Sequence, residues 1–173
     1  MDCSADERAS IFSEPMSDTP KQIVQAFYAA FAAHDGDKMA AAYADNATFS
    51  DPVFPSLRGK EVGAMWRMLT SRAKELVLTV DEILEDGPTT IIARWTAVYP
   101  FTSTGNMVTN HVTSTLRIEN GKITTQRDVF DFAAWQAQAL GAFGRFLGWT
   151  GLPGSIVRKK AAEGLQIFMS KNG

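Results

Sequence analysis

The sequence predicts one α+β domain in which N-terminal helices cover one face of a curved antiparallel sheet, with a helical extension at the C-terminus. Apolar residues recur with helical spacing as far as residue 73, and from residue 75 the period of the pattern changes to two. Short turn-forming stretches join the long alternating segments, which makes these segments antiparallel neighbours. A chain of 173 residues is long enough to bury a substantial core in a single domain.

Helical signals precede the sheet. Thr19 suits an N-cap and Pro20 the first position of a helix, and an apolar stripe follows them. Asp35 can cap a second, short helix, and Pro52 ends a short strand. The expected helices are 20–33, 37–43 and 62–73, and the expected short strand is 47–51. Residues 1–18 are expected to form a loosely held leader.

Four long strands are expected next, at residues 75–85, 89–101, 107–119 and 122–130. The core domain therefore spans residues 19–131. Residues 132–173 again have apolar residues at helical spacing, with a break at 151–155 after which Ser155 can cap the last helix. We expect this extension, residues 132–173, to pack on the same domain as a lid over a pocket or as a dimer brace. Contact of its basic residues with a membrane surface is the less favoured alternative.

Charge and cysteine content argue against several classes of function. The chain has 17 Lys and Arg against 19 Asp and Glu, so its charge does not favour nucleic acid or an anionic membrane. Cys3 is the only cysteine, and no His, Cys or carboxylate residues have metal-ligand spacing, so we expect no intrachain disulfide, metal or cofactor. The N-terminal residues lack the features of a secretory signal and no apolar run is long enough to span a bilayer, which favours a cytoplasmic location.

Strand periodicity divides the side chains of the last two strands between two faces. Residues 110, 112, 114, 116 and 118 are mostly apolar and are expected to face the helices, which leaves His111 on the opposite face, towards solvent or a dimer partner. Asp128 shares a face with Gln126, but the pattern alone does not tell which face is the inner one. An inward Asp128 would be a carboxyl among apolar residues, as expected of a functional site. The alternative is that it pairs with Arg94 or Arg127, or is solvated.

Asp51 is the second candidate site residue. It precedes Pro52, which biases its backbone towards the extended region and narrows where its carboxyl can point. The alternative is that Asp51 only shapes a turn, because Asp-Pro is a common turn opener.

Several segments resemble members of the nuclear transport factor 2-like superfamily. Residues 24–31 (VQAFYAAF), 43–53 (YADNATFSDPV) and 58–60 (RGK) resemble the start of bacterial ketosteroid isomerases. Residues 115–123 (TLRIENGKI) and 126–131 (QRDVFD) resemble the closing hairpin of SnoaL-type polyketide cyclases and limonene epoxide hydrolases. The resemblance covers residues 20–131 and implies a conical α+β barrel that dimerises through its sheet.

The matched positions carry only part of the isomerase catalytic set. The resemblance places Asp51 where the isomerases have their general base. Phe27 stands in place of the tyrosine that donates to their enolate, and Ser114 in place of their protonated Asp. Because a phenyl ring cannot donate a hydrogen bond, steroid isomerisation is not expected.

The other two families are also matched in part. Asp128 falls on the catalytic carboxylate of both the cyclases and the epoxide hydrolases, whereas the histidine of the cyclases corresponds to Ser114. Arg94 matches the arginine of the epoxide hydrolases. Thr96 replaces their first Asp, and Phe49 replaces their water-holding Tyr.

We therefore expect a pocket enzyme, an isomerase, cyclase or hydrolase that acts on a small apolar oxygenated molecule. Asp128 would be the principal acid or base, Asp51 a second carboxyl, and Arg94 would orient Asp128 or bind a substrate oxygen. The expected substrate contacts are Phe27, Phe49, Trp66, Thr96, Val112, Ser114 and Gln126. The alternatives are a non-catalytic binding protein for a lipid, terpenoid or polyketide-like ligand, and a dimeric accessory subunit with a filled pocket.

Overall fold

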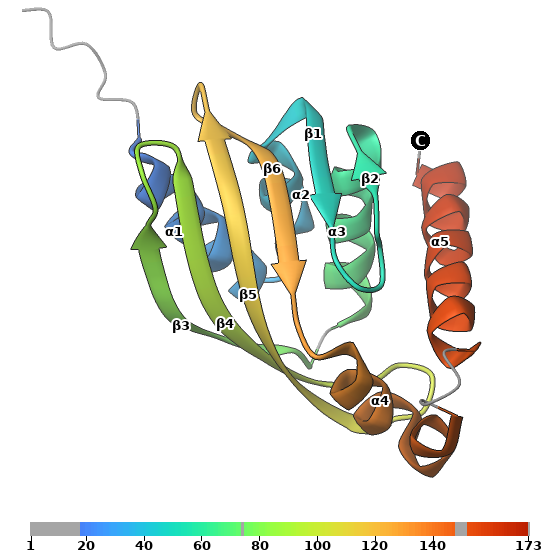
Figure 1. Cartoon of the computed structure of the whole chain (residues 1–173). Helices are drawn as coiled ribbons and strands as arrows, with labels where there is room; N and C mark the ends of the chain where they lie inside the picture. Colours follow the sequence, from blue (N-terminus) through green and yellow to red (C-terminus); the bar gives the residue numbers. More distant parts are fainter. Residues whose placement is uncertain (1–17, 74, 148–151, 173) are drawn as a thin grey trace, which may run out of the picture.

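The computed structural model describes residues 18–73, 75–147 and 152–172. The leader expected over residues 1–18 lies, apart from Asp18, outside the described residues. The elements follow in the order α1 (Pro20–Ala32), α2 (Gly36–Ala41), β1 (Tyr43–Ser50), β2 (Leu57–Arg58), α3 (Lys60–Arg72), β3 (Val77–Glu85), β4 (Thr90–Pro100), β5 (Met107–Glu119), β6 (Lys122–Val129), α4 (Phe132–Leu147) and α5 (Leu152–Asn172) (Figure 1). The α+β class and the order of the predicted elements are confirmed.

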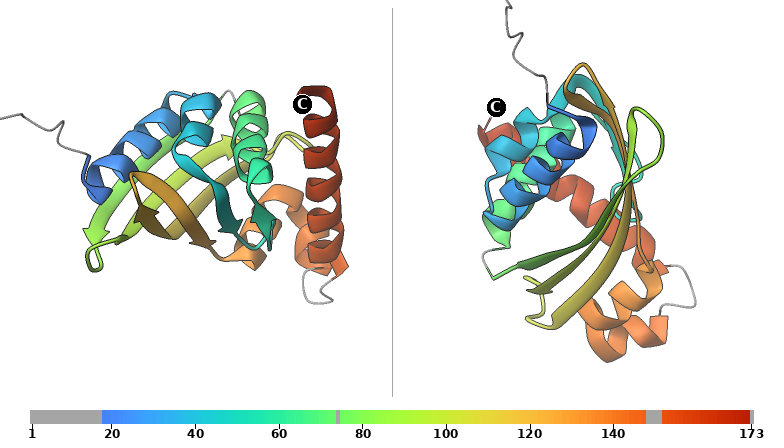
Figure 2. Two further views of the ribbon diagram at one scale, coloured as in Figure 1. Left: turned by 90° about the horizontal axis from the view of Figure 1, so that it is seen from above. Right: turned by 90° about the vertical axis from the view of Figure 1, so that its left-hand side faces the viewer.

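The strands form one curved, unclosed sheet in the order β2-β1-β6-β5-β4-β3. Strands β3 to β6 pair antiparallel with their chain neighbours, as their short connections predict. Strand β1 pairs with β6 in parallel, so the sheet is not purely antiparallel as the sequence pattern predicted. Helices α1, α2 and α3 lie against one face of the sheet, and α5 runs beside α3 (Figure 2). The inner face of the sheet is therefore the face that can hold a site.

Helix α1 begins at the predicted cap. The Gln22 N–H donates to the Thr19 hydroxyl (3.3 Å), and the Thr19 N–H donates to the Gln22 side-chain oxygen (2.8 Å), which together form a capping box. The buried face of α1 includes Val24 and Phe27. The Phe27 ring meets the Trp66 ring of α3 edge-on, with centroids 5.5 Å apart. Such packing gives the inner face of the sheet a rigid aromatic support.

Burial alternates along β5 and β6 as the predicted parity requires. Val112 and Ser114 are buried, whereas His111 is exposed on the other face of the sheet. On β6, Gln126 is fully buried and Asp128 is 5% exposed. Asp128 therefore lies on the inner face, which resolves the question that periodicity alone left open.

Strand β2 was not predicted, and of the boundaries two differ most from the prediction. Strand β1 begins at Tyr43 rather than at residue 47, because Tyr43 already pairs with Ile123 before an irregularity in the ladder. Helix α5 begins at Leu152 rather than after a cap at Ser155, since a proline is tolerated in the first turn of a helix. Of the apolar residues at helical spacing in the extension, Phe143, Phe146 and Leu147 have side chains that lie outside the described ones. Within the described residues, no helix is long and apolar enough to cross a membrane.

Candidate active site

A cavity of about 840 Å³ lies between the inner face of the sheet, helix α3 and the two C-terminal helices. Its walls are mostly apolar and include Phe31, Phe49, Phe54, Met65, Trp66, Met68, Leu69, Trp95, Ala97, Val112 and Phe130. Asp51 and Asp128 are the only carboxyls among its described lining residues. The two carboxyls that the sequence singled out therefore line the same, mostly apolar cavity.

The C-terminal extension forms part of the wall of this cavity. Trp135 and Leu140 of α4 and Val157 and Ala161 of α5 line it. The Arg158 Nε–H donates to the carbonyl of Pro52 (2.8 Å), which ties α5 to the loop that follows β1. Its guanidinium carbon also lies 5.1 Å from the centre of the Phe132 ring. In this structure the extension thus covers the cavity of its own chain.

The parallel pairing of β1 with β6 brings Asp51 and Asp128 together. Phe49 pairs with Gln126 and Ser50 with Arg127, so the next residues along the two strands are Asp51 and Asp128. Neighbouring strands lie about 4.8 Å apart, and residues at one level of a parallel pair point to the same face. Both carboxyls line the cavity, and the charge of Asp51 contributes to the raised pKa of Asp128.

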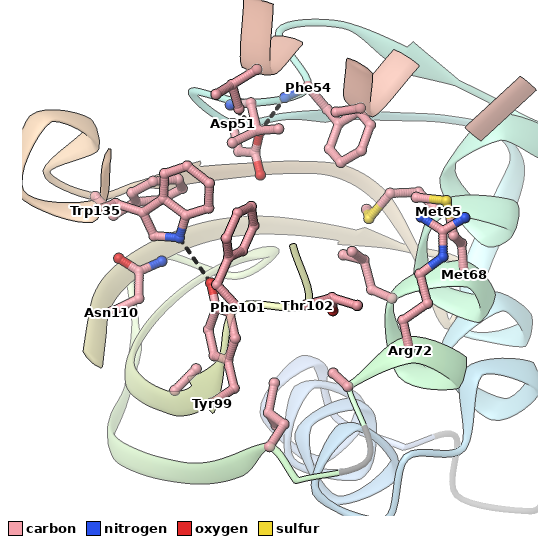
Figure 3. A pocket seen from close by; sticks show the side chains of 18 of the residues that line it. Asp51, Phe54, Met65, Met68, Arg72, Tyr99, Phe101, Thr102, Asn110 and Trp135 are labelled. Atoms are coloured by element: carbon pink, nitrogen blue, oxygen red, sulfur yellow. Dashed lines mark hydrogen bonds between the residues drawn. The ribbon is translucent and has the colours of Figure 1, made fainter. Parts of the chain in front are cut away.

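Asp51 is held by the loop that it opens. Its Oδ1 accepts the backbone N–H groups of Val53 (2.7 Å) and Phe54, and its own N–H donates to the carbonyl of Phe54 (2.9 Å). The turn chemistry weighed as an alternative is therefore present together with the site position. Burial raises the pKa of Asp51 to about 6 against the opposing effect of the two backbone hydrogen bonds. Figure 3 shows its carboxyl projecting into the cavity.

Asp128 is the more deeply buried of the two carboxyls. Its pKa is raised from 3.8 to about 7, chiefly by burial and to a smaller extent by the charge of Asp51. Hydrogen bonds from Ser114 and Gln126 oppose this rise. A carboxyl with such a pKa can exchange a proton near neutral pH, which is the property that general acid–base catalysis needs.

A directed chain of hydrogen bonds ends on Asp128. The Trp66 indole N–H donates to the Tyr43 hydroxyl (2.8 Å), which donates to Gln126 Oε1 (2.5 Å). The Gln126 amide N–H then donates to Asp128 Oδ1 (2.9 Å). An indole nitrogen can only donate, so the direction of every bond in the chain is fixed. Asp128 Oδ1 is therefore an acceptor.

A second, shorter chain reaches Asp128 from β4. The Trp95 indole N–H donates to Ser114 Oγ (2.8 Å), and the Ser114 hydroxyl bonds to Asp128, its partner across the β5–β6 ladder. Two tryptophans thus orient the groups that hold Asp128. Side chains fixed in this way keep a carboxyl in one geometry, as a site requires.

Arg94 and Thr96 do not reach the cavity, so their predicted roles there are wrong. On β4 the inward positions are Ala93, Trp95 and Ala97, and the residues between them point outward. Arg94 pairs with Glu82 on the outer face, where 56% of its side chain is exposed. The Thr96 hydroxyl donates to Asp81 Oδ2 (3.0 Å) and lies 2.9 Å from His111 Nδ1.

The other predicted substrate contacts fall into two groups. Phe49, Trp66 and Val112 line the cavity, and their contact with a substrate stays a prediction. Phe27 is 1% exposed and packs on Tyr28, Tyr43 and Trp66 in the core, outside the cavity lining. Ser114 and Gln126 are also absent from the lining, and instead each forms a hydrogen bond with Asp128.

Sequence reasoning missed several polar side chains in the cavity wall, among them Tyr99, Asn110 and Trp135. The Trp135 indole N–H donates to the Tyr99 hydroxyl (2.8 Å), so the hydroxyl hydrogen of Tyr99 is left for another acceptor (Figure 3). Among the described residues, the Asn110 side-chain amide has no hydrogen-bond partner. Strand parity could have found Tyr99 and Asn110, since they continue the inward positions of β4 and β5. Trp135 lies in the extension, where no strand pattern applies.

The chain belongs to the SnoaL-like domain family, because the model of this family matches residues 24–126. This confirms the resemblance seen in the sequence. Asp51 lies inside the matched segment, whereas Asp128 and the two C-terminal helices lie beyond its end. No protein with a curated function matches the chain in sequence. Among the described residues, no three His, Cys, Asp or Glu side chains converge as metal ligands do.

Solved structures share the nuclear transport factor 2-like fold. An LEH-like epoxide hydrolase from M. tuberculosis is 21% identical to this chain, with a TM-score of 0.59. The match covers 76% of this chain and 95% of that chain. A putative polyketide cyclase from Pseudomonas putida is 20% identical (TM-score 0.60; 70% and 98%). A hypothetical protein with a ketosteroid isomerase-like fold from Catenulispora acidiphila, in complex with trimethylamine, is 17% identical (TM-score 0.60; 70% of this chain and 94% of that chain). At these identities the likeness concerns the fold.

Proposed function

We propose that this SnoaL-like protein is an isomerase, cyclase or hydrolase that moves protons within a small apolar oxygenated substrate, using Asp128 and Asp51 as general acid and base. One observation carries the proposal. The buried carboxyl of Asp128 and the half-buried carboxyl of Asp51, which come from the ends of two adjacent parallel strands, line the same apolar cavity. Neighbours described as an epoxide hydrolase and a putative polyketide cyclase are compatible with this chemistry.

We infer different roles for the two carboxyls from their different environments. With pKa values of about 7 for Asp128 and about 6 for Asp51, between these values Asp128 is mostly protonated and Asp51 mostly ionised. Asp128 would then be the general acid and Asp51 the general base. Turnover is expected to follow a bell-shaped pH profile whose two limbs belong to the coupled pair.

Polar groups on the cavity wall could hold the substrate oxygen. The Tyr99 hydroxyl can donate a hydrogen bond, and the Asn110 amide can both donate and accept. These side chains would take the orienting role that sequence reasoning gave to Arg94. Phe49, Trp66 and Val112 would contact the apolar body of the substrate.

The test is turnover of a panel of enones, terpenoid epoxides and polyketide-like β-keto esters by the wild-type protein and by Asp128→Asn and Asp51→Asn. Each substitution removes the proton exchange but keeps the size of the side chain, and a loss of at least about 100-fold in kcat is expected. Arg94→Ala is the matched control, because it removes a charge from the outer face of the same sheet. Full turnover by both Asn variants on a substrate that the wild type converts would refute the catalytic roles.

Non-catalytic binding of a lipid, terpenoid or polyketide-like molecule is the second candidate. It is favoured by the loss of the relatives' partner residues at Phe27, Ser114 and Thr96, and by the position of Arg94 outside the cavity. Native mass spectrometry of the purified protein discriminates between the two. A co-purified ligand that stays unchanged on incubation supports binding, and its conversion supports catalysis.

The outer face of the sheet is the proposed homodimer interface. It exposes Val77 (63%), Met107 (58%) and Val129 (51%), which lie on three different strands. Exposed apolar side chains on one sheet face favour association with another copy of the chain. The superfamily resemblance points to the same face.

A further inference from the structure

Two cationic side chains line the mouth of the cavity. The exposed members of its lining are Arg72 at the end of α3, Thr102 and Ser103 after β4, and Ile156 and Lys160 on α5. These residues mark where the cavity opens to solvent. Arg72 and Lys160 give this opening two positive charges, whereas of the cavity's two carboxyls Asp128 is buried and Asp51 is half-buried.

Both cations lie where α3 contacts α5. A Cβ atom placed on Gly164 would lie 3.5 Å from Arg72 Nη1, so the guanidinium lies against α5 at Gly164. Lys160 is one helical turn before Gly164 and therefore on the same face of α5. Among the residues that the structure describes, neither cation forms an ion pair, whereas the adjacent Lys159 pairs with Glu163.

The cavity separates opposite charges. Figure 3 shows Arg72 on one side of the cavity, with Asp51 and Trp135 on the other. The space next to Arg72 is bounded by apolar side chains, among them Met65 and Met68. An anionic group would be repelled at the carboxyl pair, because Asp51 is ionised above a pH of about 6, and attracted at the Arg72 and Lys160 end. This separation of charge favours the orientation in which the anionic end of a ligand lies at Arg72 and Lys160.

We propose that the cavity takes an amphipathic acid, a molecule with an apolar body and a terminal carboxylate that Arg72 and Lys160 bind at the mouth. This substrate class rests on the proposed function, since it places the uncharged, oxygenated end of the molecule at Asp51 and Asp128. A guanidinium presents two N–H groups in the geometry of a carboxylate, and an ammonium adds a third donor. Arg72 lies inside the segment that the family model matches, whereas Lys160 and its helix lie outside it, so the extension supplies one of the two cations of the anion site.

The test is competition for the cavity between a carboxylate and its uncharged analogue. The fluorescent, neutral probe N-phenyl-1-naphthylamine is displaced at pH 7 by decanoate or by decan-1-ol. Wild-type protein is expected to bind decanoate about tenfold more tightly than decan-1-ol, as charge-assisted hydrogen bonds to a partly exposed site allow. The Arg72→Ala, Lys160→Ala double variant should lose this preference and keep its affinity for decan-1-ol. Higher salt should weaken only the binding of decanoate.

The control is Arg58→Ala, which removes an exposed arginine that does not line the cavity and should keep the preference. Equal affinity of the wild type for decanoate and decan-1-ol, or a preference that survives in the double variant, would overturn the anion site. Neither result would touch the roles of Asp51 and Asp128, which are tested by turnover of their Asn variants. Failure of the probe and both competitors to bind would overturn the anion site as well.

Discussion

Asp51 and Asp128 lie next to each other on neighbouring chain segments. Asp51 directly follows Ser50 and Asp128 directly follows Arg127, and Ser50 pairs with Arg127 in the parallel β1–β6 ladder. Because β1 and β6 run parallel, the carboxyl-terminal ends of the two strands lie side by side at the same end of the sheet. If β1 and β6 were antiparallel, their carboxyl-terminal ends would lie at opposite ends of the sheet. The repulsion between the two carboxyls follows from this topology, and their titrations are expected to be coupled.

Replacement of Asp128 by Asn should stabilise the protein at high pH. A carboxyl whose pKa is raised from 3.8 to about 7 in the folded state contributes stability below its unfolded pKa and loses it as the pH rises through about 7. A rise of this size corresponds to about 4 kcal/mol, so we expect Asp128→Asn to gain about 2–4 kcal/mol over the wild type at pH 8 and less at pH 5. Urea unfolding at the two pH values measures this difference.

The Arg94→Ala variant serves as the control for that experiment. Its exposed ion pair with Glu82 is worth less than about 1 kcal/mol at either pH. If Asp128→Asn is less stable than the wild type at pH 8, Asp128 is not a buried carboxyl that resists ionisation.

Replacement of Tyr43 by Phe should break the longer hydrogen-bond chain. Gln126 Oε1 loses its donor and the Trp66 indole N–H loses its acceptor, and each buried group left without a partner costs about 1–3 kcal/mol. Gln126 is then held less firmly against Asp128, so the pKa of Asp128 should rise further. An NMR titration of the Asp128 carboxyl measures this shift. Tyr99→Phe removes a hydroxyl from the cavity wall outside this chain and should leave the Asp128 value close to that of the wild type.

Charges on the outer face of the sheet should dissociate the proposed homodimer. The double variant Met107→Lys, Val129→Lys places two cations on exposed positions of β5 and β6. We expect sedimentation at about twice 18.9 kDa for the wild type and at the monomer mass for the variant. Ile167→Lys changes a similarly exposed residue of α5 and should remain dimeric. A monomeric wild type would rule out this interface.

Much of the fold was accessible from local patterns. The capping signal at Thr19 and the alternation along β4, β5 and β6 depend only on neighbouring residues, and the structure confirms them. The same alternation contradicts the role carried over to Arg94 by resemblance, because Trp95 beside it faces inward. For Arg94, the alternation of side chains along the strand predicted the correct face of the sheet, whereas the position matched to the epoxide hydrolases did not.

Long-range features were not accessible in this way. The proximity of Asp51 to Asp128 depends on the parallel register of β1 with β6, which no local pattern encodes. The direction of the chain from Trp66 through Tyr43 to Gln126 requires side-chain positions from three elements. The extension contributes Trp135 and Lys160 to the cavity wall. This contribution likewise depends on how the helices pack on the domain, which the sequences of the helices alone do not reveal.

The most direct test of the carboxyl pair is a carbon-13 NMR titration of the Asp side-chain carboxyls between pH 3 and pH 9, in the wild type and in Asp51→Asn. We predict that the wild-type pair titrates with values of about 6 and about 7, and that Asp51→Asn lowers the pKa of Asp128 because it removes a neighbouring negative charge. Titration of both carboxyls near pH 4, or an Asp128 value that Asp51→Asn leaves unchanged, would contradict the account.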